Sequence, residues 1–125
     1  MIVHDLGPEA VARMTQVDLA ALGREPDSPI GRFSFHGCVC GVAAFQGKPP
    51  WEHHTAGDEV LIVLAGESEL TVIEQGTKAT RTISTGELVV VPQGCWHSND
   101  AKTGVTFLYM TPAGGNEHSW EEPGR

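Results

Sequence analysis

The feature that most constrains the fold is a regular alternation of short β-forming runs and turn residues, which begins at Gly31. Runs rich in Val, Ile, Thr and Phe are interrupted by Gly, Pro, Asn or Asp at intervals of roughly ten residues, a rhythm typical of a β-sandwich or barrel. The sequence therefore predicts an antiparallel all-β domain over residues 31–112. The candidate strands are Gly31–His36, Cys38–Gln46, Trp51–His54, Glu59–Ala65, Glu67–Glu74, Lys78–Ile83, Leu88–Val91, His97–Asn99 and Thr106–Thr111.

One of these candidates, the run Val60–Leu64, is apolar at every position. A strand with one face in water would alternate apolar and polar residues. We therefore expect both faces of this strand to be covered, as in a barrel that packs against a second layer. The predicted turns are Gly66-Glu67, Gln75-Gly76 and Thr85-Gly86.

The segments on either side of the β-rich region lack its strand pattern. Residues 1–30 are predicted to hold a short helix over Pro8–Met14, because proline suits the first turn and Glu9 suits the positive end. A second helical stretch is predicted over Gln16–Leu22, and we expect the whole segment to pack on the barrel or on a partner subunit. Residues 113–125 are rich in Gly, Pro and Glu and are predicted to be irregular. The chain is expected to form one domain.

The charge balance excludes several classes of partner. Eight basic residues against sixteen acidic ones give a net charge of -8. Such a chain repels phosphate backbones and anionic headgroups, so we expect neither a nucleic-acid partner nor a membrane partner. The longest apolar runs are much too short to span a bilayer.

The cysteines and the N-terminus indicate a cytoplasmic location. Three cysteines, an odd number, fit reduced thiols better than a disulfide framework. Cys38 and Cys40 occupy alternate strand positions, and we interpret them as small buried apolar residues rather than a metal or redox pair. Cys95 is likewise predicted to be a buried thiol. Met1–Ala10 shows neither the basic region nor the apolar core of a secretory signal.

The residues that carry chemistry lie in two segments. Along the first, Glu52 and His54 fall on the same face of a predicted strand, and a bend at Gly57-Asp58 returns the chain so that Glu59 faces the same space. In the second, His97 follows a strand and a Pro-x-Gly turn. Two imidazoles with one or two carboxylates suit Fe, Mn, Ni, Co, Cu or Zn, and the absence of thiolates argues against a structural zinc site.

Both segments resemble the cupin family. The run Gly86-x5-Pro92-x-Gly94-x2-His97 is similar to the second cupin motif, although Ala101 replaces the usual later Asn and Asn99 lies two residues earlier. The first motif, Gly-x5-His-x-His-x3-4-Glu-x6-Gly, can be placed in two registers.

In the preferred register of the first motif, Glu52 replaces the first histidine and His54 is the second. In the other register, His53 is the first histidine and Thr55 replaces the second. The preferred form, Trp-Glu-x-His-x-x-Gly-Asp-Glu, looks like a variant found among small bacterial cupins. The closing run Thr111–His118 also resembles that subgroup.

The resemblance implies a jelly-roll barrel, also called a double-stranded β-helix, with metal ligands at His54, Glu59 and His97. Glu52 stands where the family has its first histidine and either ligates the metal directly or hydrogen-bonds a ligand. His53 is the reserve ligand. The implied cofactor is a divalent ion, namely Fe, Mn, Ni or Zn. The resemblance also implies a homodimer, which would cover Val60–Leu64 through a two-fold interface.

Two functions are compatible with this site. The first is a metal-dependent enzyme of the dioxygenase, isomerase or lyase type that acts on a small metabolite inside the barrel, with Glu52 as general base if it is not a ligand. The alternative is a non-catalytic barrel that binds or senses a small molecule or a metal. The tail residues His118 and Trp120 receive no catalytic role.

Overall fold

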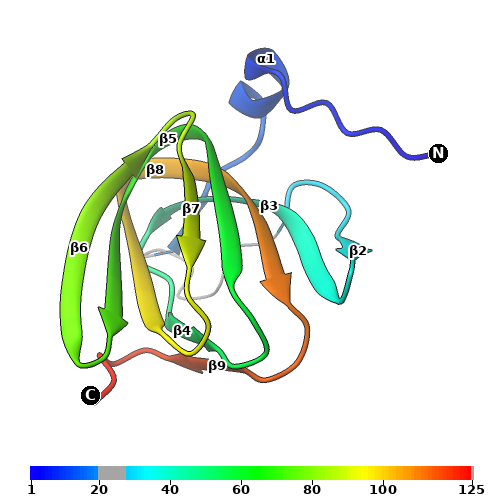
Figure 1. The fold of residues 1–125 in the computed structure, drawn as a ribbon. Helices are drawn as coiled ribbons and strands as arrows, with labels where there is room; N and C mark the ends of the chain where they lie inside the picture. The colour runs from blue at the N-terminus through cyan, green and yellow to red at the C-terminus, as the bar shows by residue number, and fades with distance from the viewer. Residues whose placement is uncertain (20–27, 125) are drawn as a thin grey trace.

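The computed structural model describes residues 1–19 and 28–124. These residues form one short helix and nine strands (Figure 1). The elements are α1 (Pro8–Ala12), β1 (Val17–Asp18), β2 (Phe33–Phe35), β3 (Cys38–Gly47), β4 (Trp51–His54), β5 (Glu59–Glu74), β6 (Thr77–Ser84), β7 (Leu88–Val91), β8 (Trp96–Pro112) and β9 (Asn116–Ser119). All described strand pairs are antiparallel except β1 with β3. The predicted all-β barrel is confirmed.

The two long strands, β5 and β8, organise the barrel. They pair with each other along most of their length, and they also pair with β7, β6, β3 and β4 (Figure 1). The turn predicted at Gly66-Glu67 is wrong, because β5 continues through it with a register shift. The two short strands predicted between His97 and Thr111 are likewise parts of the single strand β8.

Glycines allow β5 and β8 to cross closely at this irregularity. Gly66 has a φ of +75°, and a Cβ built there would lie 2.3 Å from the carbonyl oxygen of Gly104. Gly104 has a φ of +100°, also in the region that favours glycine. A bulge can therefore form where the sequence alone suggested a turn.

The flanking segments differ from the prediction in two places. The helix predicted at Pro8–Met14 is confirmed over Pro8–Ala12. This helix contacts β5, and its Val11 side chain is buried. Val17–Asp18 forms a strand beside β3 rather than part of a helix, and the remainder of that prediction, from residue 20, lies outside the described residues. The tail was predicted to be irregular, but Asn116–Ser119 forms strand β9 on the edge of β4.

Alternate residues of each long strand point into the barrel. On β5 the buried inward row begins with Glu59 and continues with Leu61 and Val63. The apolar part of the row joins a core whose members include Phe45 and Phe107, which meet edge to face with ring centroids 5.7 Å apart. The barrel interior is therefore charged where β5 begins, at Glu59, and apolar from Leu61 onward along this strand.

Within the described residues, the outer face of the same strands is only partly covered, whereas both faces of Val60–Leu64 were expected to be covered. Val60 and Ile62 are half-buried, and their partners on β7, Val90 and Leu88, are 52% and 59% exposed. Within the described part of the chain, no helix is long and apolar enough to cross a membrane.

Candidate metal centre

Three strands bring the four polar residues of the site together. His54 lies two positions after Glu52 on β4, so their side chains share the inward face, as predicted. Glu52 is paired directly with His97 on β8. Glu59 is the first residue of β5 and begins its inward row. Three strands thus supply the four side chains to one point.

Two hydrogen bonds fix the segment before His97 against the segment after His54. The backbone N–H of Gly94 donates to the His54 carbonyl oxygen at 2.8 Å, and the backbone N–H of Gln93 donates to the Asp58 carboxylate at 2.8 Å. Gly94 itself has a φ of +78°, which permits the tight turn. The Pro-x-Gly turn and the Gly-Asp bend recognised in the sequence therefore join into one support for the site.

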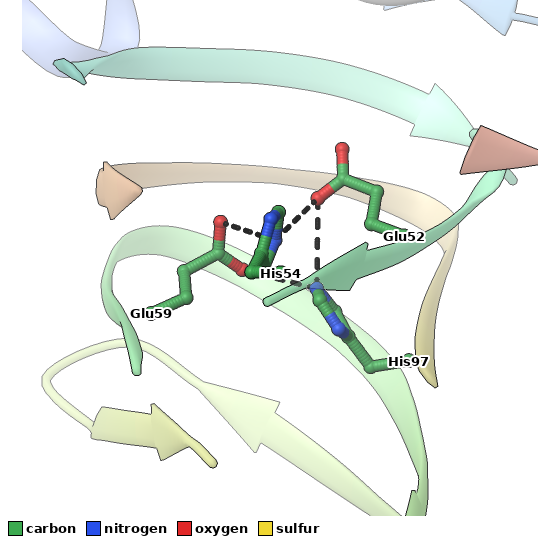
Figure 2. Close-up of side chains that lie close together, drawn as sticks. All are labelled: Glu52, His54, Glu59 and His97. Carbon is green, nitrogen blue, oxygen red and sulfur yellow. Dashed lines mark ion pairs between the residues drawn. The ribbon is translucent and has the colours of Figure 1, made fainter. Parts of the chain in front are cut away.

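The four side chains converge on a small space (Figure 2). The His54 Nε2 atom lies 3.3 Å from Glu52 Oε2 and 3.2 Å from Glu59 Oε2. The His97 Nε2 atom lies 3.5 Å from Glu52 Oε2 and 3.0 Å from Glu59 Oε1. One ligand atom from each of the four residues falls within 4.8 Å of the others.

The Nδ1 atoms of His54 and His97 make hydrogen bonds that direct both Nε2 atoms into the cluster. His54 Nδ1 lies 2.9 Å from the side-chain oxygen of Asn116, and His97 Nδ1 lies 3.2 Å from the backbone carbonyl of Cys95. Both partners are acceptors, so each Nδ1 carries a hydrogen, and in the neutral imidazole Nε2 then holds the lone pair. This is the arrangement that metal-binding histidines adopt.

The donor set fits a divalent metal. Both Nε2 atoms are buried and have no hydrogen-bond partner, although carboxylate oxygens are nearby. Ligands about 2.0–2.2 Å from one ion are separated by roughly 3.0 Å at right angles and roughly 3.4 Å at tetrahedral angles. The nitrogen–oxygen separations of 3.0–3.5 Å match that range. The cluster could therefore hold a metal ion.

The electrostatics of the metal-free cluster agree with this fit. Burial opposes a charge on either histidine, but the Glu52 and Glu59 carboxylates outweigh it and raise the pKa of His54 to about 10 and that of His97 to about 9. Burial would favour neutral carboxyls, yet contacts with the histidines hold the pKa of Glu52 well below its usual value and lower that of Glu59. A divalent ion that replaced the two imidazolium protons would leave the net charge of the cluster unchanged.

Several residues considered in the sequence lie elsewhere. His53, the reserve ligand, faces away from the cluster and stacks on Trp96 with ring centroids 4.7 Å apart. Cys38, Cys40 and Cys95 are free thiols. Cys40 and Cys95 are buried as predicted, and burial raises the pKa of both, whereas Cys38 is only half-buried.

Three residues around the cluster were missed by sequence reasoning. Strand β9 places Asn116 opposite His54 and His118 opposite Glu52, where His118 Nε2 lies 3.6 Å from Glu52 Oε1. The Thr111 hydroxyl donates to Glu59 Oε2 at 2.6 Å. The only available signal was the likeness of the run from Thr111 to His118 to the closing segment of small bacterial cupins.

A cavity of about 310 Å³ opens over the cluster. Its apolar walls include Phe45, Leu61 and Phe107, and its polar lining includes Asn99 and Tyr109. A concave, partly apolar site with a few converging polar groups is the usual form of a small-molecule site. The cluster therefore lines a space that a ligand can enter.

Comparisons with known proteins agree with this architecture. A family model described as a cupin domain matches residues 42–111, which include all four residues of the cluster. An uncharacterized protein of Bacillus subtilis (strain 168), YdbB, is 34% identical over 56 residues, a match that covers 45% of this chain and 47% of YdbB. The match thus spans about half the length of that relative.

Solved structures show the same fold at lower sequence identity. Protein NMB1881 from Neisseria meningitidis has a TM-score of 0.57 and 23% identity, covering 76% of this chain and 92% of that one. A hydroquinone 1,2-dioxygenase, PnpCD, solved in complex with Cd2+ and 4-hydroxybenzonitrile, has a TM-score of 0.59 and 16% identity, covering 86% of this chain and 71% of that one.

Proposed function

Because the chain belongs to the cupin family, whose model matches more than half of it, we propose that it is a metal-dependent enzyme acting on a small molecule inside the barrel. The metal ligands in this proposal are Glu52, His54, Glu59 and His97. The observation that carries it is the pair of buried Nε2 atoms, which face two carboxylates and have no hydrogen-bond partner. Their contacts with the carboxylates, at 3.0–3.5 Å, lack the geometry of hydrogen bonds, and a metal ion would satisfy all four groups at once.

A divalent ion held here, such as iron, manganese, nickel or zinc, supplies Lewis-acid chemistry to a substrate oxygen, and redox chemistry where the metal is redox-active. A dioxygenase with the same fold was solved in complex with Cd2+, which is compatible with the proposed metal. The cavity above the cluster gives the substrate access and, through its apolar walls, limits the entry of water.

Glu52 has the geometry of a proton acceptor as well as a ligand. Its side chain is 33% exposed, whereas that of Glu59 is 4% exposed. Glu52 Oε2 faces the histidines, while Oε1 lies 3.6 Å from His118 Nε2. Oε2 would face a bound metal, and Oε1 would accept a proton from the substrate, with His118 orienting that oxygen. A base beside a Lewis acid suits isomerase and lyase reactions, and the same ligands suit a dioxygenase.

Metal analysis of the purified protein tests the proposal, with Glu59→Gln as the variant and Glu69→Gln as the matched control. Glu59 is buried in the cluster, whereas Glu69 pairs with Lys102 on the surface at 3.1 Å. We expect about one ion per chain, and a loss of affinity in Glu59→Gln of more than about a hundredfold, exceeding what loss of a supporting hydrogen bond costs. Glu69→Gln is expected to bind like the wild type.

Equal and weak binding of iron, manganese, nickel and zinc by wild type and Glu59→Gln would contradict the metal site. Tight binding without turnover or oxygen uptake across a substrate panel would instead favour a barrel that binds or senses a small molecule without catalysis.

We also propose that two copies of the chain pair through the outer face of the sheet formed by β5, β7 and β8. Pairing brings Val60 beside Val90 and Met110 on this face, and Ile62 beside Leu88. These five side chains are uncharged in a chain of net charge -8, so two copies can meet through them with little repulsion. Sedimentation at micromolar concentration is expected to show a dimer that Val90→Asp converts to a monomer; a monomeric wild type would contradict the pairing.

A further inference from the structure

The cavity over the cluster contains a positive charge that the metal site does not use. Among the described residues that line it, Arg32 is the only lysine or arginine. Arg32 immediately precedes β2 and is exposed, so its guanidinium lies toward the open side of the cavity. The site therefore has two chemically different parts, a ligand cluster at its base and a cation at its edge.

The position of Arg32 is fixed by Tyr109. The Arg32 Nε–H donates to the Tyr109 hydroxyl oxygen at 3.0 Å. Tyr109 in turn packs against β3 where Gly41 has no side chain, because a Cβ at Gly41 would lie 2.6 Å from the Tyr109 hydroxyl oxygen. The guanidinium is thus held by a neutral phenol, which leaves its positive charge uncompensated.

Three other cations among the described residues have acidic partners, and a fourth, Lys48, lies 5.3 Å from the centre of the Trp51 ring. Lys78 pairs with Glu122, Arg81 with Glu87, and Lys102 with Glu69. Within residues 1–19 and 28–124, Arg32 makes no ion pair with a carboxylate.

The charge balance of the filled site points to an anionic ligand. A divalent ion is balanced by the Glu52 and Glu59 carboxylates, with both histidines neutral. The charge of Arg32 then has no counter-charge in the described cavity wall. A ligand that carries one negative charge would supply it, and an arginine binds a carboxylate through paired hydrogen bonds.

The dimensions of the cavity limit the size of that ligand. A volume of about 310 Å³ has room for on the order of ten non-hydrogen atoms, if each takes the space of a water molecule in the liquid. Tyr109 and Thr111 are alternate residues of β8, roughly 7 Å apart along one face, and Thr111 bonds to Glu59 of the cluster. A ligand of that size can span from the arginine to the metal, and Leu61 and Phe107 line the same cavity.

We propose that Arg32, held by Tyr109, forms an anion subsite, and that the substrate is a small monocarboxylate with an apolar body and an oxygen at its far end for the metal. Hydroxy and oxo acids of about ten non-hydrogen atoms belong to this class. The proposal rests on the proposed metal site, because the far oxygen has its partner there.

Binding of matched probes tests the subsite without requiring turnover. The probes are 4-hydroxybenzoate and its neutral isostere 4-hydroxybenzamide, titrated by calorimetry into protein loaded with Zn2+. An aliphatic pair with its hydroxyl at the far end, 6-hydroxyhexanoate and its amide, is titrated in the same way. We expect the carboxylate of at least one pair to bind at least about tenfold more tightly than its amide, since hydrogen bonds to charged groups are the stronger ones.

Two variants locate the source of this preference. In Arg32→Gln the preference for the carboxylate is expected to fall at least about tenfold, while amide binding changes little. Arg81→Gln removes the same charge from the outer surface, where Arg81 pairs with Glu87, and is expected to bind both probes like the wild type. Tyr109→Phe is expected to reduce the preference severalfold, because Arg32 loses its anchor.

The possible failures are distinguishable. If neither pair shows a carboxylate preference, or if a preference persists unchanged in Arg32→Gln, the anion subsite is wrong, and the metal site still stands wherever the same samples hold one Zn2+ per chain. If Zn2+ does not bind, the proposed function fails first, and a carboxylate preference measured in metal-free protein and lost in Arg32→Gln would still support the arginine subsite.

Discussion

Two regions of the barrel interior lie along the same strand and have opposite character. The inward row of β5 starts with Glu59, which meets the two histidines, and continues with Leu61 and Val63, which belong to the apolar core. Burial of the apolar residues favours folding by about 25 cal/mol for each Å² removed from water. Burial of the charged cluster opposes folding unless its members are paired or bind a metal. Stability should therefore reside in the core region, and ligand chemistry in the region around Glu59.

A core truncation is expected to have the largest effect on stability and almost none on the site. Ile83 is 2% exposed and belongs to the apolar core. Ile83→Ala should lower the free energy of unfolding by about 2–5 kcal/mol, because methyl groups are lost and a cavity remains. Metal affinity of the folded protein should change less than about twofold, since sites without shared partners act nearly independently. Urea unfolding and metal titration measure the two effects. A loss of affinity like that of Glu59→Gln would show that the regions are not separable.

Metal loading is expected to act in the opposite direction, through the charged region alone. An ion at a hundredfold excess over its dissociation constant should raise the free energy of unfolding by about 2.7 kcal/mol. Glu59→Gln at the same ion concentration should gain much less, because one ligand is absent. Urea unfolding with and without Zn2+ provides the measurement. An unchanged unfolding midpoint in the wild type would count against metal binding by the folded state.

Removing the support of a single ligand should have an intermediate effect. Asn116 accepts the hydrogen of His54 Nδ1 and so directs the Nε2 lone pair into the cluster. Asn116→Ala is expected to weaken metal binding by about 10- to 100-fold, the usual cost of losing such a partner. Asn116→Asp keeps an acceptor and serves as the matched control. The role of Asn116 would be refuted if both variants bound metal equally well.

A further expected effect is a pH dependence restricted to the metal-free protein. Its histidines have pKa values of about 10 for His54 and about 9 for His97, above the ordinary 6.5. Their contribution to stability is therefore fully present below about pH 6.5 and is lost as the pH rises through 9 to 10. We expect the free energy of unfolding to fall by at least about 1 kcal/mol between about pH 7 and about pH 9.

In metal-loaded protein both histidines are neutral ligands, so this decline should disappear. Urea unfolding across the pH range, with and without the ion, makes the comparison. The same decline in both forms would show that it originates outside the cluster.

The sequence predicted the barrel and the four cluster residues because both depend on local patterns. The alternation of Glu52 and His54 on one strand and the Pro-x-Gly turn before His97 are readable within a few residues. The preferred register of the first motif agrees with the geometry, because Glu52 joins the cluster and His53 does not.

The sequence did not reveal the surroundings of the cluster, because these depend on long-range pairing. Asn116 and His118 reach the site through β9, whose pairing with β4 was hidden in a tail rich in Gly, Pro and Glu. Arg32 and Tyr109 are 77 residues apart and meet only through the folded arrangement of the barrel. The merging of the short predicted strands into β5 and β8 likewise required the close approach of Gly66 and Gly104.

Crystallography of metal-soaked protein, with anomalous data collected at the metal edge, tests the central claim most directly. One anomalous peak per chain is expected between Glu52, His54, Glu59 and His97, about 2.0–2.2 Å from both imidazole Nε2 atoms. A peak bound elsewhere, or no peak at a concentration of metal that saturates binding in solution, would contradict the account.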